Sequence, residues 1–484
     1  MTRWAFRSAT ELARSLRDRE VGAEELLDYF LGRVERLNPK INAVVARDEA
    51  RARERARRAD AAVAAGEVLG PLHGVPMTVK ESFDVAGLPS THGIPEMRGN
   101  VAERDALAVQ RLEAAGAIVF GKTNVPLRLA DFQSYNEIYG TTENPYLAGR
   151  VPGGSSGGSA AALAAGLTGL ELGSDIGGSI RNPAHFCGVF GHKPTWDLLP
   201  PRGHAAPGVL SSTDIAVIGP LARSAEDLEL ALQVLAGPDE ISARAVRYEL
   251  PVSGKPIASW RVAVWPDDAA APVGAESRAR IEAVAQLFAD AGATVDHAAR
   301  PAIDPALSQA TYDSLLQPAM SGRLPDERFA ELLARADALE AGDDSARART
   351  LRNQVLRHRD WLQAHEARTH LRWAWHEFFQ QWDVLLTPMM ATPAFPHDHR
   401  PFGERTIDVD GAPRPYFEQI FWAGLTGVAF LPSTVVPTGP GAEGLPLGVQ
   451  IAGPEWGDRI TIEAARFLEQ SGLRFVPPAG FEDE

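Results

Sequence analysis

Two clusters rich in glycine and serine stand close together in the sequence, at residues 153–159 and 173–179. Glycines at this density cost backbone entropy, so they indicate unusual backbone angles or a close approach of the main chain to another group. A serine that follows such glycines at the start of a helix lies among unpaired N–H groups. A developing oxyanion would be stabilised there. The clusters therefore favour the chemistry of a serine hydrolase.

Other interpretations of the clusters are weaker. Apolar segments bracket both clusters, whereas flexible linkers are polar throughout, and no Gly-Lys-Ser/Thr follows either one, as a P-loop requires. The stretch from Gly154 to Gly158 matches the G-x-S-x-G nucleophile elbow, with Ser156 as nucleophile. That elbow needs a preceding strand, but residues 144–152 contain two prolines and little strand character. A non-catalytic protein that binds phosphate or another ligand through glycine loops is an alternative of another class.

A lysine ends a short, mostly apolar segment upstream of the clusters. With a period of two, Val75, Met77 and Val79 share one face of a strand, and Thr78 and Lys80 share the other. Burial lowers the pKa of a lysine from about 10.4 by up to several units, so a buried Lys80 would be a neutral amine that acts as a general base near pH 7. The alternative is an ordinary lysine in a salt bridge.

Composition narrows the classes of protein. The 484 residues suffice for about three average domains or one large α/β domain, and 45% hydrophobic residues supply a large core. A net charge of −15 argues against a nucleic-acid or anionic-membrane partner. The single cysteine, Cys187, excludes an internal disulfide. Neither a signal peptide nor a membrane span is recognisable, so we expect a cytoplasmic protein, with the periplasm left open.

Strand and helix signals alternate along most of the chain, which is typical of an α/β layer architecture. Ser8 and Glu11 predict a capping box at the start of two amphipathic helices. Further elements are predicted as follows: helices at 46–66, 105–115, 417–426 and 459–470, and strands at 117–121, 169–173, 189–193, 260–265, 383–387, 431–436 and 447–451. Residues 302–382 are highly charged and predict helices without strands.

Three motifs in this order resemble the amidase signature family. They are Gly-Val-Pro-x-x-Val-Lys at 74–80, Pro-Gly-Gly-Ser-Ser-Gly-Gly-Ser at 152–159 and Gly-Ser-Asp-x-Gly-Gly-Ser-Ile-Arg at 173–181. The resemblance is strong over residues 70–235 and fainter over 417–470. It implies an α/β fold in which α-helices cover both faces of a large mixed β-sheet. We expect a single domain over residues 1–484: a core of 65–300 and 383–475, N-terminal helices at 8–66 and a helical insertion at 302–382.

The resemblance also implies a Ser-cisSer-Lys triad. Ser179 would be the nucleophile, Ser155 the serine in a cis peptide and Lys80 the base. Neutral Lys80 would take a proton from Ser155, which takes one from Ser179, and the relay would then protonate the leaving nitrogen. The oxyanion hole would consist of the backbone N–H groups of Ile176, Gly177, Gly178 and Ser179. The family often has Thr where this chain has Ile176, a change that a backbone donor tolerates.

Substrate-binding residues follow from the resemblance less directly. Leu129, Ala130 and Asp131 fall where relatives line the acyl pocket, and Asp131 would either attract a cationic substrate or hold a loop. The expected activity is hydrolysis of a small aliphatic or aryl carboxamide, with esters as further substrates. The alternative is the glutaminase component of a tRNA-dependent amidotransferase.

No cofactor and no metal are expected, since His397 and His399 lie in a proline-rich loop without a carboxylate partner. The expected partner is the small-molecule amide substrate alone, without nucleic acid or membrane, and a homodimer is left open.

Overall fold

A mixed sheet of eleven strands runs through the computed structural model, which describes residues 4–482. The strands lie in this order: β1 (Val44–Arg47), β3 (Ile118–Thr123), β2 (Pro76–Lys80), β6 (Glu171–Asp175), β8 (Val217–Ala222), β7 (Phe190–Lys193), β14 (Ser433–Pro440), β15 (Pro446–Ala452), β11 (Val384–Pro388), β9 (Arg261–Val264) and β10 (Thr294–Asp296). β2 runs parallel to both β3 and β6, and the five pairs from β6 through β8, β7, β14 and β15 to β11 are antiparallel.

Helices cover both faces of this sheet, as the resemblance implies. The strands β2, β3, β6, β8, β11 and β15 are buried at every residue, which is typical of strands covered on two sides. The helices are α1 (Ala9–Arg17), α2 (Ala23–Leu37), α3 (Glu49–Ala64), α4 (Leu107–Ala114), α5 (Gly157–Ala164), α6 (Arg181–Cys187), α7 (Ala225–Leu235), α8 (Ala275–Asp290), α9 (Pro305–Ser321), α10 (Asp326–Asp337), α11 (Ala346–Gln354), α12 (His358–Phe379), α13 (Ile420–Gly427) and α14 (Asp458–Gln470). Two small hairpins are also present: β4 (Tyr135–Asn136) with β5 (Gly140–Thr141), and β12 (Thr406–Val409) with β13 (Ala412–Pro415).

The N-terminal segment contains more than helices. The predicted capping box is confirmed at α1, where Ser8 Oγ accepts from the Glu11 N–H (3.1 Å) and the Glu11 carboxylate accepts from the Ser8 N–H (2.8 Å). The unpredicted strand β1 joins the edge of the sheet, antiparallel to β3. Four residues are too few to show an alternating pattern, so only the pairing with β3 defines this strand.

For the eleven-stranded sheet, predicted and observed strands agree closely except at three places. β8 and β10 are, like β1, absent from the predicted set, although β8 lies near the centre of the sheet. β8 contains Gly219 and Pro220, two residue types that usually weaken a strand. Burial between β6 and β7 overrides that local preference.

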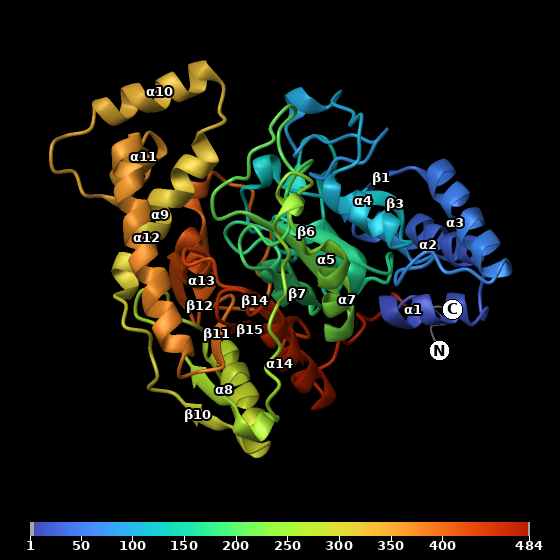
Figure 1. Cartoon of the computed structure of the whole chain (residues 1–484). Coiled ribbons are helices and arrows are strands. Elements are labelled where there is room, and N and C mark those ends of the chain that lie inside the picture. The colour runs from blue at the N-terminus through green and yellow to red at the C-terminus, as the bar shows by residue number, and fades with distance from the viewer. Residues whose placement is uncertain (1–3, 483–484) are drawn as a thin grey trace.

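The segment between β10 and β11 is helical, as predicted. Helices α9 to α12 occupy residues 305–379 and gather at the end of the molecule opposite α1 to α3 (Figure 1). α9 packs against α11, α12 and α13. The buried side chains of Trp375 and Phe378, on α12, belong to one apolar cluster with residues of α9 and α13. Among residues 4–482, no helix combines the length and apolar character needed to cross a membrane.

Candidate active site

Lys80, at the end of β2, is fully buried. Its Nζ donates to Ser155 Oγ at 2.7 Å and to Ser174 Oγ at 2.9 Å. Burial lowers the pKa of Lys80 to about 7, and the nearby charge of Asp175 opposes this shift only in part. Near neutral pH a large share of the Lys80 side chains is therefore the neutral amine, which can accept a proton across the contact with Ser155.

Ser155 follows a cis peptide bond between Gly154 and Ser155, as the resemblance implies. A Cβ atom at position 154 would lie 2.2 Å from the carbonyl oxygen of Asp131 and 2.4 Å from that of Gln133. Only glycine fits there. The Gly154 N–H donates to Asn182 Oδ1 at 2.9 Å, so the first cluster is held between the 131–133 segment and α6.

Ser179 lies in the turn that joins β6 to α6. The Asp175 carboxylate organises this turn by accepting from the N–H groups of Gly178 (2.8 Å) and Ile180 (3.1 Å). The Ser156 N–H donates to the carbonyl oxygen of Ser179 at 3.1 Å, which joins the two glycine–serine clusters directly. The sheet therefore brings Lys80 and both clusters to one place, as the family resemblance implies.

The predicted set of oxyanion donors needs one correction. The Gly178 N–H is occupied, because it donates to Asp175 Oδ1. The N–H groups of Ile176, Gly177 and Ser179 donate to no protein acceptor within the described part of the chain. Gly178 therefore shapes the turn, and the other three N–H groups are the candidates for binding an oxyanion.

The nucleophile-elbow interpretation of Ser156 is wrong. No strand precedes Gly154 within residues 144–153, all of which the structure describes. The Ser156 side chain is fully buried, and its hydroxyl donates to the Ser174 carbonyl and accepts from the Ser174 N–H, both at 3.3 Å. This hydroxyl joins the first cluster to β6 and lines neither of the cavities described below.

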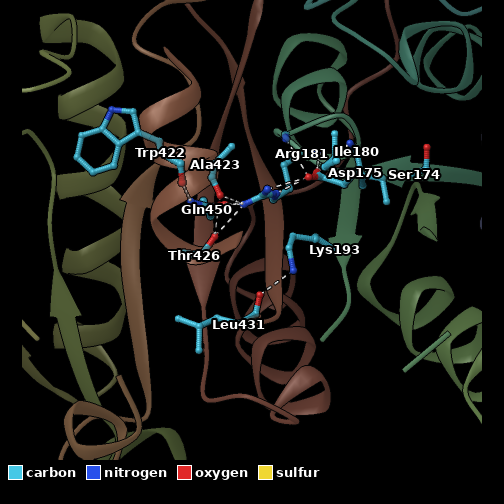
Figure 2. A network of polar contacts seen from close by, with 12 residues as sticks. Ser174, Asp175, Ile180, Arg181, Lys193, Trp422, Ala423, Thr426, Leu431 and Gln450 are labelled. Carbon is cyan, nitrogen blue, oxygen red and sulfur yellow. Dashed lines mark hydrogen bonds and ion pairs between the residues drawn. The ribbon is translucent and has the colours of Figure 1, made fainter. Parts of the chain in front are cut away.

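Arg181 connects the active-site turn to the C-terminal half of the chain (Figure 2). Its guanidinium donates to Asp175 at 2.8 and 3.0 Å on one side, and to Thr426 Oγ1 (2.9 Å) and Gln450 Oε1 (2.7 Å) on the other. Both charged side chains are completely buried. Burial alone would raise the pKa of Asp175, but the charge and hydrogen bonds of Arg181, with the charge of Lys193 and the Ile180 N–H, together outweigh burial and hold that pKa well below its usual range. The turn therefore carries a paired buried charge.

We expect the substitution Arg181→Met to lower the free energy of unfolding by about 3–5 kcal/mol, because it leaves the Asp175 carboxylate buried without a counter-charge. Urea unfolding followed by fluorescence measures this. The double variant Arg181→Met/Asp175→Asn should recover part of the loss, since it removes the orphaned charge. An unchanged midpoint in the single variant would show that the pair contributes nothing.

Two cavities meet at Ser179. The smaller, of about 270 Å³, is lined by Ser155 and Ser174, by His92, His204 and Arg128, and by apolar residues such as Val209 and Leu210. The larger, of about 630 Å³, is lined by one face of α9 and by several phenylalanines. Both cavities share Leu129, Ala130, Ile176, Ser179 and Met320. A substrate bound at Ser179 therefore has two separate spaces for the two sides of its scissile bond.

The predicted substrate-binding segment lies at the junction of these cavities. Leu129 and Ala130 line both, and Asp131 lines the larger one. Asp131 is paired with Arg405 at 2.7 Å and also accepts from the hydroxyl of Tyr416. Its charge is therefore neutralised within the protein. This favours a role in holding the loop in place over a role in attracting a cationic substrate.

Tyr312 and Ser174 are site residues that the sequence does not predict. Ser174 belongs to the second cluster, which was the only signal in the sequence, and its position in β6 beside β2 emerges only from the fold. Tyr312 comes from α9 in the helical segment, is fully buried and donates its hydroxyl to the carbonyl oxygen of Ile176 at 2.9 Å. No local pattern marks Tyr312, because its partner lies 136 residues away.

We expect Tyr312→Phe to lower kcat by about three- to tenfold with little change in KM, because the lost hydrogen bond, worth about 1 kcal/mol, holds the peptide whose N–H, that of Gly177, is a candidate oxyanion donor. Steady-state kinetics on any accepted amide measures it. Tyr146→Phe is the matched control, since the Tyr146 hydroxyl donates to the carbonyl oxygen of Val476, which lines neither cavity. Equal effects of the two substitutions would contradict a specific role of Tyr312.

The two histidines considered as metal ligands have other contacts. His397 Nε2 lies 3.2 Å from a carboxylate oxygen of Glu143, and the His399 ring stacks on Tyr135. Over residues 4–482, no group of three or more His, Cys, Asp or Glu side chains is arranged to hold a metal ion.

Comparisons with known proteins identify relatives of this chain. The sequence model of a protein family described as Amidase matches residues 25–462. A glutamyl-tRNA(Gln) amidotransferase subunit from Synechococcus sp. (strain JA-3-3Ab) is 33% identical over 482 residues, 95% of this chain and 91% of the relative. An acylamidase from Rhodococcus erythropolis is 32% identical over 478 residues, 96% of this chain and 94% of the relative. The solved structure of a bacterial aryl acylamidase shares the fold, with a TM-score of 0.81 and 24% identity over 98% of this chain and 99% of that chain.

The chain therefore belongs to the amidase signature family, whose members include hydrolases acting on amide C–N bonds. The match covers most of the N-terminal helices, the sheet and the helical segment between β10 and β11.

Proposed function

We propose that this enzyme hydrolyses small carboxamides through an acyl-enzyme on Ser179, with Ser155 and Lys80 as the proton relay. One observation carries the proposal: the Nζ of a buried lysine lies 2.7 Å from the hydroxyl of the cis-peptide serine, beside a cavity that Ser179 also lines. A buried amine with a pKa near 7 is suited to accept a proton at neutral pH.

The reaction uses each of these groups twice. Ser179 Oγ attacks the amide carbon while its proton passes to Ser155, and the Ser155 proton passes to Lys80. The N–H groups of Ile176, Gly177 and Ser179 stabilise the negative oxygen that forms. The relay then runs in reverse, the C–N bond breaks and the nitrogen leaves as a neutral amine. Water repeats the sequence on the acyl-enzyme and releases the acid.

The two cavities accommodate the two products of this reaction. The leaving nitrogen must receive its proton from Ser155, and Ser155 lines only the smaller cavity. The leaving amine therefore occupies the smaller cavity, and the acyl group occupies the larger one. The phenylalanines of the larger cavity suit an aliphatic or aryl acyl group.

The glutaminase alternative has the support of relatives named as components of an amidotransferase. Glutamine would place its α-carboxylate in the acyl cavity. No Lys, Arg or His of the described chain lines that cavity, whereas Asp313 and Glu418 do. The α-ammonium of glutamine would be attracted to these carboxylates, but its α-carboxylate would meet no counter-charge there and would be repelled. We therefore favour a free-standing amidase.

A substrate screen tests this proposal. Aliphatic amides, aryl amides, anilides and glutamine are offered to the purified enzyme, and a serine-directed fluorophosphonate is used to label it. Turnover of acyl amides or anilides and labelling of Ser179 are expected. Exclusive turnover of glutamine would support the amidotransferase alternative, and absence of both turnover and labelling would favour a non-catalytic binding protein.

The single-domain organisation, the cytoplasmic location and a homodimer stay predictions.

A further inference from the structure

One face of α9 forms a wall of the acyl cavity. The residues Gln309, Asp313, Leu316, Gln317 and Met320 recur at helical spacing and all line it. Asp313 is the only charged residue among these five. Its Oδ1 accepts from Gln309 Nε2 at 2.9 Å, and it has no ion-pair partner within 4.0 Å in the described part of the chain.

Asp313 differs from the other carboxylates of this cavity. Asp131 is paired with Arg405 at 2.7 Å, and Glu418 is paired with Arg414, whose Nε donates to it at 3.0 Å. Asp313 lacks such a partner. Burial raises the pKa of Asp313 to about 6, and the hydrogen bond from Gln309 and the more distant charge of Arg349 oppose this shift incompletely. A cation in the cavity would compensate this carboxylate.

The remaining wall of the cavity also favours a cation attached to an apolar chain. Four phenylalanines line it: Phe132, Phe402, Phe417 and Phe421. Aromatic faces attract alkylammonium groups and pack against methylene or aryl groups. The combination of one unpaired carboxylate, aromatic rings and no basic side chain matches an ammonium group on an apolar spacer.

We propose that Asp313 is a specificity-determining residue that binds a protonated amine on the acyl part of the substrate, so that the preferred substrates are amides of amino-substituted aliphatic or aryl acids. This inference rests on the proposed function, because it uses Ser179 as the nucleophile and the larger cavity as the acyl site.

A matched pair of substrates tests the inference. δ-Aminovaleryl para-nitroanilide and hexanoyl para-nitroanilide have nearly the same shape and differ by an ammonium in place of a methyl group. A series with shorter and longer spacers covers the distance from Ser179 to Asp313. At the best length we expect kcat/KM to be about tenfold or more higher for the amine, mainly through KM, as for a charge-assisted hydrogen bond. Asp313→Asn should remove this preference and leave hexanoyl turnover within about threefold of wild type.

Glu418→Gln is the matched control, because Glu418 lines the same cavity but is already paired. This variant should keep the preference for the amine. A second measurement needs no variant. When wild-type enzyme hydrolyses the hexanoyl substrate, n-pentylamine should act as a competitive inhibitor and n-pentanol should not inhibit. Equal kcat/KM for amine and alkyl substrates at every length, or equal losses for both in Asp313→Asn, would overturn the role of Asp313. If no anilide were cleaved and Ser179 were not labelled, the proposed function would fail as well.

Discussion

Ser179→Ala is expected to lower kcat by about 10⁶-fold, the scale measured when a nucleophilic serine is removed from a hydrolase. Alanine keeps the backbone of the turn, the donors at Ile176 and Gly177, and the hydrogen bonds of Asp175. The folded structure should therefore persist while the acyl-enzyme cannot form. Substrate KM should change little, because Ser179 contributes chemistry rather than binding.

Steady-state kinetics and intact-protein mass spectrometry measure this effect. Wild type should gain the mass of one fluorophosphonate adduct at Ser179, and Ser179→Ala should gain none. Ser156→Ala is the matched control: its hydroxyl bonds only to the backbone of Ser174, so labelling at Ser179 should survive. Retained turnover in Ser179→Ala would reject the assignment of the nucleophile.

Lys80→Ala should lower kcat by about 10⁴-fold, the upper end of what a positioned general base contributes. The loss is large because Lys80 takes the proton in acylation and returns it to the leaving nitrogen. Kinetics on the same amide measures it, with circular dichroism as the check of folding. A loss of less than tenfold would remove Lys80 from the base role.

The pH profile of kcat/KM tests whether Lys80 acts as a base in catalysis or only supports the fold. Below a pKa of about 7 Lys80 is protonated and cannot accept a proton, so kcat/KM should rise with pH through about 7 and then level off. The residual activity of Lys80→Met should lack this inflection. Lys193→Met is the control, since burial also lowers the pKa of Lys193 to about 7 but its Nζ donates, within residues 4–482, only to the carbonyl oxygens of Pro194 and Leu431. An inflection that follows Lys193 instead of Lys80 would contradict the relay.

Much of the fold and the motifs that carry the candidate triad could be recognised because the signals are local. The capping box at Ser8, the short strand that ends at Lys80 and the glycines around Ser155 and Ser179 all depend on neighbours within a few residues. Glycine at 154 marks a position where a carbonyl oxygen leaves no room for a side chain. Such steric requirements can be recognised directly from the type of residue at the position.

Contacts between segments far apart in the chain could not be recognised from the sequence in this way. Asp131 could be interpreted in two ways until Arg405, 274 residues away, was seen to neutralise it. The occupied N–H of Gly178 and the hydroxyl of Tyr312 on Ile176 likewise depend on how the turn closes and where α9 packs. Strand β8 contains Gly219 and Pro220 and exists because its neighbours in the sheet provide pairing and burial.

The amino-acid sequence by itself indicated the candidate reacting groups of this protein: a lysine at the end of an apolar strand and serines among glycines, whose proposed roles follow from the family resemblance. Tertiary structure alone decided the surroundings of those groups, namely the two cavities at Ser179, the pairing of Asp131 and the unpaired carboxylate of Asp313. The physical reason is that backbone conformation responds to adjacent residues, whereas burial and charge compensation depend on atoms that only folding brings together.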